Sequence, residues 1–202
     1  MVILALTLAG CSGGEKDRAA SPAGGTLVIS VSGDPENLLP PLSSTVTSQI
    51  IGDLVYDHLA EIGDSLNTIG DEGFKPRLAK SWTWSPDSLA IAFHLNPTAR
   101  WHDGVPVRAS DVVFTWKTYA DPANGSPFAA SIAAIDSVTA PDSATAVMWF
   151  KTRSPMQFYD AVNAMSILPA HALGAAKVPE LATAALARAP IGTGRFRFVK
   201  WT

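Results

Sequence analysis

The sequence predicts an α+β domain with mixed sheets and flanking helices. Residues 89–95 alternate apolar and polar side chains, and residues 135–150 contain two further runs rich in β-branched and apolar residues; both are typical of strands with one buried face. Residues 45–59 and 110–120 instead repeat apolar residues at helical spacing. Strands and helices do not alternate regularly along the chain, which favours α+β over a parallel α/β fold.

The composition restricts the possible classes of function. The chain has 202 residues, of which 47% are hydrophobic and 16% charged, so it can bury a core and is not expected to be disordered. Its length allows one domain or two small lobes. The formal net charge of −3 predicts neither a nucleic-acid partner nor a polybasic membrane anchor. A single cysteine excludes an internal disulfide framework and a cysteine-based zinc site.

The N-terminus predicts a lipoprotein signal over residues 1–11. Its apolar run is shorter than the roughly 20 residues that span a bilayer and suits the apolar region of a secretory signal, about 7 to 15 residues long. Leu8-Ala9-Gly10-Cys11 resembles the lipobox of bacterial lipoproteins, in which the thiol is acylated and the signal is cut just before it. The resemblance implies lipidation of Cys11. The alternative is a buried structural cysteine.

Residues 12–25 show no periodicity and are rich in Gly, Ser and Ala. This composition predicts a flexible tether between the lipid and the folded domain. The protein is therefore expected to be anchored to a membrane surface rather than embedded in the membrane.

The first elements of the folded part are a strand and a helix. Thr26–Ser32 is a β-rich run between glycines and predicts a strand. Thr45–Leu59 predicts a helix, for which Ser44 or Thr45 supplies the N-cap.

The middle of the chain predicts a hairpin followed by a helix. Trp82–Ser85 and Leu89–Leu95 form the two strands, with a proline-containing turn between them. His102–Gly104 forms a second turn. The helix at Ser110–Ala120 ends before Asp121-Pro122, because the residue before a proline disfavours helical dihedral angles.

The last third predicts a second hairpin, two helices and a strand. Ile135–Ala140 and Thr145–Phe150 pair across a Pro-Asp-Ser turn. A helix begins with Ser154 as its cap and a proline at its first position. Glu180–Arg188 is alanine-rich and helical, and Arg195–Trp201 begins a new strand.

Motifs of catalysis are missing from the sequence. There is no G-x-S-x-G, and the four histidines lack H-E-x-x-H spacing. Gly192-Thr193-Gly194 lacks the third glycine of a nucleotide-binding loop. A surface hydrolase would need a nucleophile–base pair, and none is evident. We therefore expect a protein that is not an enzyme and that has no metal or cofactor.

Four segments, taken in order and spacing, resemble one family. The segment Trp101–Val107 with Ala109–Phe114 is the most specific of the four. They are Leu78–Trp82 with Ser85–Ser88 and Phe93–Leu95; Trp101–Val107 with Ala109–Phe114; Ile167–His171; and Pro190–Gly194 with Phe196 and Trp201. Together they are similar to the family 5 solute-binding proteins, the oligopeptide- and dipeptide-binding lipoproteins of ABC importers. The chain departs from the family at Arg108, where a Thr usually caps the next helix, so we expect Ser110 to take that role.

The resemblance implies the N-terminal portion of a two-lobed periplasmic-binding-protein type II fold, which closes around a solute. Residues 26–44 and 160–202 are expected in the main lobe and residues 45–159 in an appended subdomain, with the C-terminal lobe absent and the chain a fragment. The implied function is the substrate-binding component of an ABC importer, a monomer outside the membrane, in the periplasm or at the cell surface, that delivers solute to a permease and its ATPase. The alternative is a solute-sensing or chaperone-like binding lipoprotein of the same fold.

The resemblance also implies binding residues. Phe128 follows a segment whose aromatic residue reaches the ligand in relatives, although it would equally serve as a core aromatic. Ser44, Thr45 and Val46 correspond to a loop that lines the cleft, and Asn163 lies near another cleft position. Some relatives carry a carboxylate at the place of Ser44. Its absence leaves the solute open between a peptide, a nickel chelate, a sugar oligomer and an opine-like compound.

Overall fold

The computed structural model describes residues 28–31, 33–174 and 180–201. Residues 32–202 form one compact unit. Its elements are η1 (Pro40–Leu42), α1 (Val46–Val55), β1 (Ala60–Ile62), β2 (Phe74–Pro76), β3 (Ala79–Trp84), β4 (Ala90–Leu95), α2 (Ala109–Ala120), η2 (Pro122–Asn124), β5 (Ile135–Thr139), β6 (Thr145–Phe150), α3 (Gln157–Asn163), α4 (Ala170–Leu173), α5 (Glu180–Thr183) and η3 (Ala185–Ala187).

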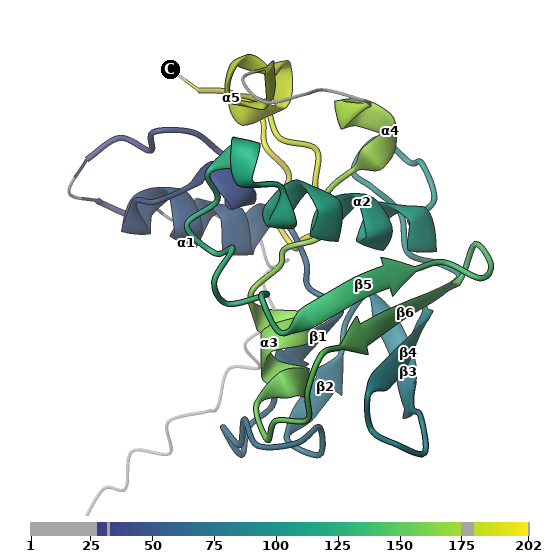
Figure 1. Ribbon diagram of the computed structural model, residues 1–202. Helices are drawn as coiled ribbons and strands as arrows, with labels where there is room; N and C mark the ends of the chain where they lie inside the picture. Colours follow the sequence, from purple (N-terminus) through teal and green to yellow (C-terminus); the bar gives the residue numbers. More distant parts are fainter. Residues whose placement is uncertain (1–27, 32, 175–179, 202) are drawn as a thin grey trace, which may run out of the picture. The chain divides into compact units, whose positions relative to one another are not determined.

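Both predicted hairpins belong to one antiparallel sheet in the order β3-β4-β6-β5 (Figure 1). β1 and β2 form a separate two-stranded sheet. In the central pair, Ile91 lies opposite Met148 and Phe93 opposite Ala146. All four are buried, whereas Trp149, which follows Met148, is 45% exposed. The alternation in the sequence is thus the alternation between the two faces of the sheet.

The buried face of the sheet is covered by α2, which contacts β5 and β6, and by an aromatic cluster around Phe158 of α3. The Phe158 side chain is fully buried. Its ring centroid lies 4.8 Å from that of Phe74, 4.9 Å from that of Trp82 and 5.8 Å from that of Phe93. Separations of 4.5–7 Å are those at which aromatic rings attract one another, so one side chain links β2, β3, β4 and α3.

Helix α1 ends four residues earlier than predicted. Thr45 is its N-cap, and its hydroxyl accepts a hydrogen bond from the Ser48 N–H. The helix ends at Val55 because later residues have other backbone partners. The Leu54 and Val55 carbonyls accept hydrogen bonds from Phe196 and Gly194. The carbonyls of His58 and Leu59 accept from residues 78 and 79.

Four other local expectations are wrong. Residues 28–31, the described part of the expected strand 26–32, are not in a strand. Arg195–Trp201 does not pair as a strand either, because Phe196 donates to a helix carbonyl. Helix α3 begins two residues after Pro155, and Ser154 lies in the preceding turn. The helix expected at Glu180–Arg188 is divided at Ala184 into α5 and η3.

The predicted role of Ser110 is also wrong. Arg108 is the N-cap of α2, and its backbone N–H donates to the carboxylate of Asp111 at 2.8 Å. Asp111 also accepts from the Ala170 N–H at 3.1 Å and from the Trp101 indole at 3.3 Å. Burial raises the pKa of Asp111, although these hydrogen bonds oppose the effect. A buried carboxylate with three donors therefore holds the N-cap residue Arg108 in place, while Ser110 lies in the first turn of α2.

The Trp101–Gly104 turn holds the Gly192–Gly194 segment. His102 donates its backbone N–H to the Gly192 carbonyl at 2.8 Å. Its Nδ1 accepts from the Gly192 N–H at 3.3 Å, and its Nε2 lies 3.0 Å from the Gly194 carbonyl. Since a carbonyl only accepts, this network assigns the ring proton to Nε2. His102 thus holds the Gly192–Gly194 segment against the Trp101–Gly104 turn by three hydrogen bonds.

Candidate functional site

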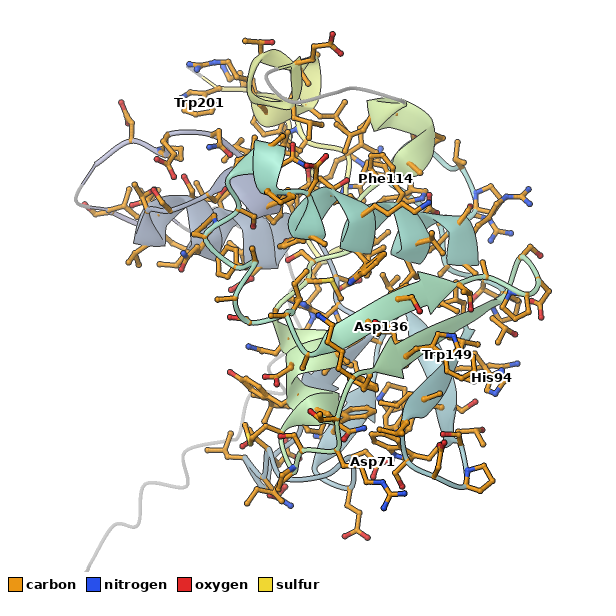
Figure 2. The ribbon with its side chains drawn as sticks, viewed as in Figure 1. Asp71, His94, Phe114, Asp136, Trp149 and Trp201 are labelled. Atoms are coloured by element: carbon orange, nitrogen blue, oxygen red, sulfur yellow. The ribbon has the colours of Figure 1, made fainter. Side chains whose placement is uncertain are left out.

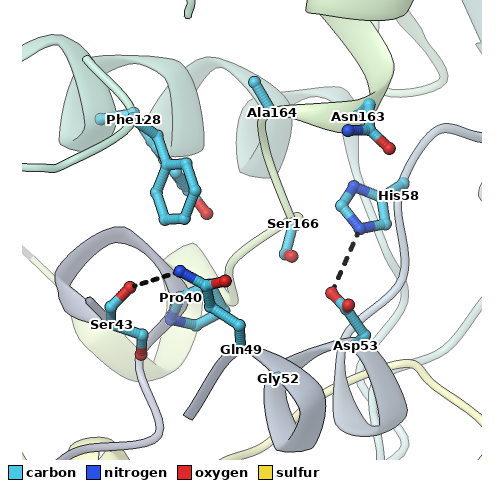
Figure 3. Close-up of a pocket in the computed structure, with 11 residues that line it drawn as sticks. Pro40, Ser43, Gln49, Gly52, Asp53, His58, Phe128, Asn163, Ala164 and Ser166 are labelled. Atoms are coloured by element: carbon cyan, nitrogen blue, oxygen red, sulfur yellow. Dashed lines mark hydrogen bonds and ion pairs between the residues drawn. The ribbon is translucent and has the colours of Figure 1, made fainter. Parts of the chain in front are cut away.

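A pocket of about 350 Å³ lies between α1, the end of α3 and the segment after η2 (Figure 3). We call it the groove pocket. It is lined by Pro40, Ser43, Gln49, Gly52, Asp53, His58, Tyr119, Phe128, Asn163, Ala164 and Ser166. Helix α1 supplies one wall through successive turns: Gln49, Gly52 and Asp53 share a face because residues three and four apart on a helix are neighbours.

On the polar side of the groove pocket, Gln49 and His58 are each held by a backbone carbonyl. Gln49 donates its side-chain N–H to the Ser43 carbonyl at 3.4 Å. The Nε2 atom of His58 lies 3.8 Å from the Asp53 carboxylate, and its Nδ1 lies 3.1 Å from the Met165 carbonyl. The carbonyl requires a proton on Nδ1, so in neutral His58 it is Nε2 that faces Asp53 as an acceptor.

The aromatic side of the groove pocket consists of Tyr119 and Phe128, with ring centroids 6.3 Å apart. Tyr119 is buried, and this burial raises the pKa of its hydroxyl, opposed by hydrogen bonds with Ser166. Phe128 is only half-buried. The Phe128 ring is thus backed by a fixed neighbour and still presents surface to the pocket.

A second pocket of about 350 Å³ adjoins the first through three shared residues, Phe128, Asn163 and Ala164. Its remaining lining includes Tyr159 and Asp160. The Asn163 side-chain amide donates to the Tyr159 hydroxyl at 2.9 Å. Partial burial raises the pKa of Asp160. The two pockets form one groove with Phe128 and Asn163 at its middle. Its lining includes the carboxylates of Asp53 and Asp160 but no Lys or Arg.

The structure brings two of the five predicted binding residues together. Phe128 and Asn163 both line the groove. Ser44, Thr45 and Val46 do not line it, but they follow Ser43, which does, at the N-terminus of α1. Among them Val46 is 70% exposed.

A carboxylate lies beside Ser44 after all, and it comes from Glu36. That carboxylate accepts from the Ser44 hydroxyl at 2.9 Å, from the Thr45 N–H at 3.1 Å and from the Ser44 N–H. The last of these hydrogen bonds lowers the pKa of Glu36 most. No local pattern marks Glu36, because it lies eight residues before Ser44 in a turn-rich segment.

Comparison with known proteins decides the family. Residues 73–202 match bacterial extracellular solute-binding proteins, family 5 Middle. The chain belongs to this family. It is a family of solute-binding proteins of ABC transporters rather than of enzymes.

Sequence relatives of this family 5 chain are longer. A Brucella ovis protein named as an ABC transporter peptide-binding protein is 39% identical over 149 residues, which are 73% of this chain and 26% of that protein. Oligopeptide-binding protein AppA of Bacillus subtilis is 27% identical over 209 residues, which are 100% of this chain and 37% of AppA. The chain thus spans about a quarter to a third of the relatives it matches.

Solved structures of family 5 proteins share the fold. NikZ from Campylobacter jejuni, in complex with Ni(L-His), has a TM-score of 0.70 and 30% identity over 85% of this chain and 32% of its own. CtaP from Listeria monocytogenes has a TM-score of 0.72 and 31% identity over 89% of this chain and 35% of its own. AppA, in complex with a nonapeptide, has a TM-score of 0.75, covers 84% of this chain and 33% of its own, and at 24% identity shows the fold alone. The expected fold class is confirmed.

Cys11 and the tether at 12–25 fall outside the described residues. Within the described ranges, none of the helices has both the length and the apolar composition needed to cross a membrane. In that same part of the chain, no three His, Cys, Asp or Glu side chains are placed to share a metal ion.

Proposed function

We propose that this chain forms one wall of the solute-binding site of an ABC importer's substrate-binding protein, and that the solute is a peptide. The groove centred on Phe128 and Asn163 carries the proposal. It combines a half-buried ring, which suits an apolar side chain, with amide and hydroxyl groups that suit a peptide main chain. Its two carboxylates, Asp53 and Asp160, stand in a lining that has no Lys or Arg, which suits a peptide's ammonium group. Membership of family 5 and the names of its relatives support the same function.

The roles of the groove residues follow from their chemistry. Phe128 packs against an apolar peptide side chain, while Gln49 and Asn163 offer amide donors and acceptors to its backbone. Asp53 and Asp160 attract its positive end. Ser44, Thr45 and Val46 extend the contact surface at the N-terminus of α1. Recognition through the main chain allows peptides of different sequence to bind.

The test is an NMR titration of the ¹⁵N-labelled chain with trialanine. Because the chain spans about a third of its relatives' length, we expect weak binding, with a dissociation constant on the order of 1 mM. The shift changes should concentrate on Gln49, Phe128, Asn163 and Ser166. Phe128→Ala should weaken binding about tenfold, equivalent to about 1.4 kcal/mol. The control is Phe196→Ala, since Phe196 is 55% exposed and lies outside the groove.

Other outcomes would contradict the proposal. Shifts confined to residues outside the groove, or equal effects of the two phenylalanine variants, would show that the groove is not the peptide site. Binding of Ni(L-His) in place of trialanine would assign a metal chelate as the solute, because NikZ holds that ligand.

We also propose that a lipid on Cys11 anchors the protein to a bacterial membrane, facing the periplasm or the cell surface. There the protein is a monomer that delivers solute to the permease of a permease–ATPase complex. The lipobox resemblance of Leu8–Cys11 and the extracellular family support this. In cells expressing the chain, Cys11→Ser should move it from the membrane fraction to the soluble fraction. An unchanged distribution would contradict lipid anchoring through this thiol.

A further inference from the structure

A separate pocket of about 530 Å³ lies at the turn of the β3–β4 hairpin and the start of α3. We call it the hairpin pocket. Asp71, one of its residues, is labelled in the lower part of Figure 2. The full lining is Gly70, Asp71, Trp84, Ser88, Arg153, Ser154, Pro155, Gln157 and Phe158. No residue is shared with the groove, so the two are different sites.

The walls of the hairpin pocket are held by contacts between distant segments. The Gly70 N–H donates to the Pro155 carbonyl at 3.0 Å. The buried Gln157 side chain donates to the Ser88 carbonyl and accepts from the Ser154 N–H, both at 2.8 Å. The pocket is therefore formed before any ligand arrives, which lowers the entropy cost of binding.

Aromatic rings supply the apolar part of the pocket. The Trp84 ring centroid lies 6.3 Å from that of the buried Phe158 and 6.4 Å from that of Phe150. Trp84 itself is only half-buried. Its indole ring thus offers a fixed surface on which a planar group can stack and over which a cation is attracted.

Two opposite charges stand in the same lining, and both retain free hydrogen-bonding capacity. Asp71 accepts the indole N–H groups of Trp82 at 2.7 Å and Trp84 at 3.1 Å, both on Oδ2; its Oδ1 has no partner among the described residues. Arg153 donates through Nε to the Asp87 carbonyl at 2.7 Å, and its charge also acts on the exposed Asp87 carboxylate. Its terminal nitrogens have no hydrogen-bond partner in the described part of the chain.

We propose that the hairpin pocket binds a free amino acid with an aromatic side chain. Its carboxylate pairs with the guanidinium of Arg153, whose forked N–H groups match carboxylate geometry. Its ammonium group lies near Oδ1 of Asp71, and its ring stacks on Trp84. Asp71 would repel an anion that has no amine, and Arg153 would repel a cation that has no carboxylate. The chemistry of the pocket therefore requires both charges and the ring in one molecule.

The test compares three ligands that differ by one group each, again by NMR titration of the chain. L-phenylalanine has both charges, 3-phenylpropionate lacks the amine and phenethylamine lacks the carboxylate. L-phenylalanine should shift the Gly70 amide, the Trp84 indole N–H and the Arg153 side chain. Each truncated ligand should bind about tenfold more weakly, equivalent to about 1.4 kcal/mol.

A pair of arginine variants separates recognition from general effects. Arg153→Gln should weaken L-phenylalanine and 3-phenylpropionate about tenfold. It should strengthen phenethylamine binding, because the charge that repels this cation is removed. The control Arg100→Gln should change none of the three, because Arg100 is likewise exposed and bonded only to backbone carbonyls, outside the pocket.

Equal affinity for all three ligands, or no binding, would overturn the proposal. So would an L-phenylalanine affinity that Arg153→Gln leaves unchanged, or shifts at Phe128 in the groove instead of at Gly70. Since Arg153 is exposed, its replacement should leave the fold intact, which the circular dichroism spectrum checks. The outcome is independent of whether the groove binds peptides.

Discussion

Gly192→Ala is expected to lower the free energy of unfolding by about 3 kcal/mol or more, the upper range for overpacking a tight contact. A Cβ atom on Gly192 would lie 1.8 Å from the Val55 carbonyl oxygen and 2.6 Å from its carbon. Both obstacles are backbone atoms at the end of α1, so no side chain can rotate away. The loop cannot withdraw easily either, because His102 bonds Gly192 through both its backbone and its ring.

The measurement is a urea titration followed by tryptophan fluorescence. Gly33→Ala is the matched control, since a Cβ there would meet nothing within 4 Å; its effect should stay within about 0.5 kcal/mol. Equal midpoints for the two variants would show that the Gly192 segment does not pack against α1 as described. Because α1 carries Gln49 and Asp53 of the groove, Gly192→Ala should also weaken trialanine binding.

Phe158→Ala is expected to cost about 3–5 kcal/mol, the range for removing a fully buried aromatic ring. Phe158 lies within 6.3 Å, centroid to centroid, of Phe74, Trp82, Trp84 and Phe93. Its removal would leave a cavity where β2, β3, β4 and α3 meet. These elements cannot all close the gap, because hydrogen bonds fix β3 to β4 and β4 to β6.

The same urea titration measures this loss, with Phe196→Ala as the control. The Phe196 side chain is 55% exposed, so its removal should change stability by less than about 0.5 kcal/mol. A Phe158→Ala variant as stable as the control would contradict the cluster. Because Phe158 also lines the hairpin pocket, the variant should further reduce L-phenylalanine binding.

Local patterns in the sequence were sufficient for the hairpins and for α1 and α2. Alternation in 89–95 and 145–150 marks the buried face directly, because side chains on a strand point to opposite faces in turn. Local patterns failed at Arg195–Trp201, where β-rich residues do not pair as a strand. They also failed at the start of α2, where Arg108 and not Ser110 is the N-cap and Asp111 accepts the Arg108 N–H.

The candidate site was only partly predictable. Phe128 and Asn163 were named from the family resemblance, not from any local pattern, and the structure brings both to one groove. Tyr119, His58 and Ser166 were missed, because nothing in their neighbouring residues marks them. The same holds for Asp71 and Arg153, which meet in the hairpin pocket from segments far apart in the chain.

The sequence alone determined three things: the α+β class, the pairing of neighbouring strands and the solute-binding family. Each of them depends on residue order within short segments. Only the tertiary structure decided where α1 ends, which glycines are in contact with its last turn and which side chains share a pocket. Those outcomes depend on contacts between residues distant in the chain, and such contacts leave no periodic trace in the sequence.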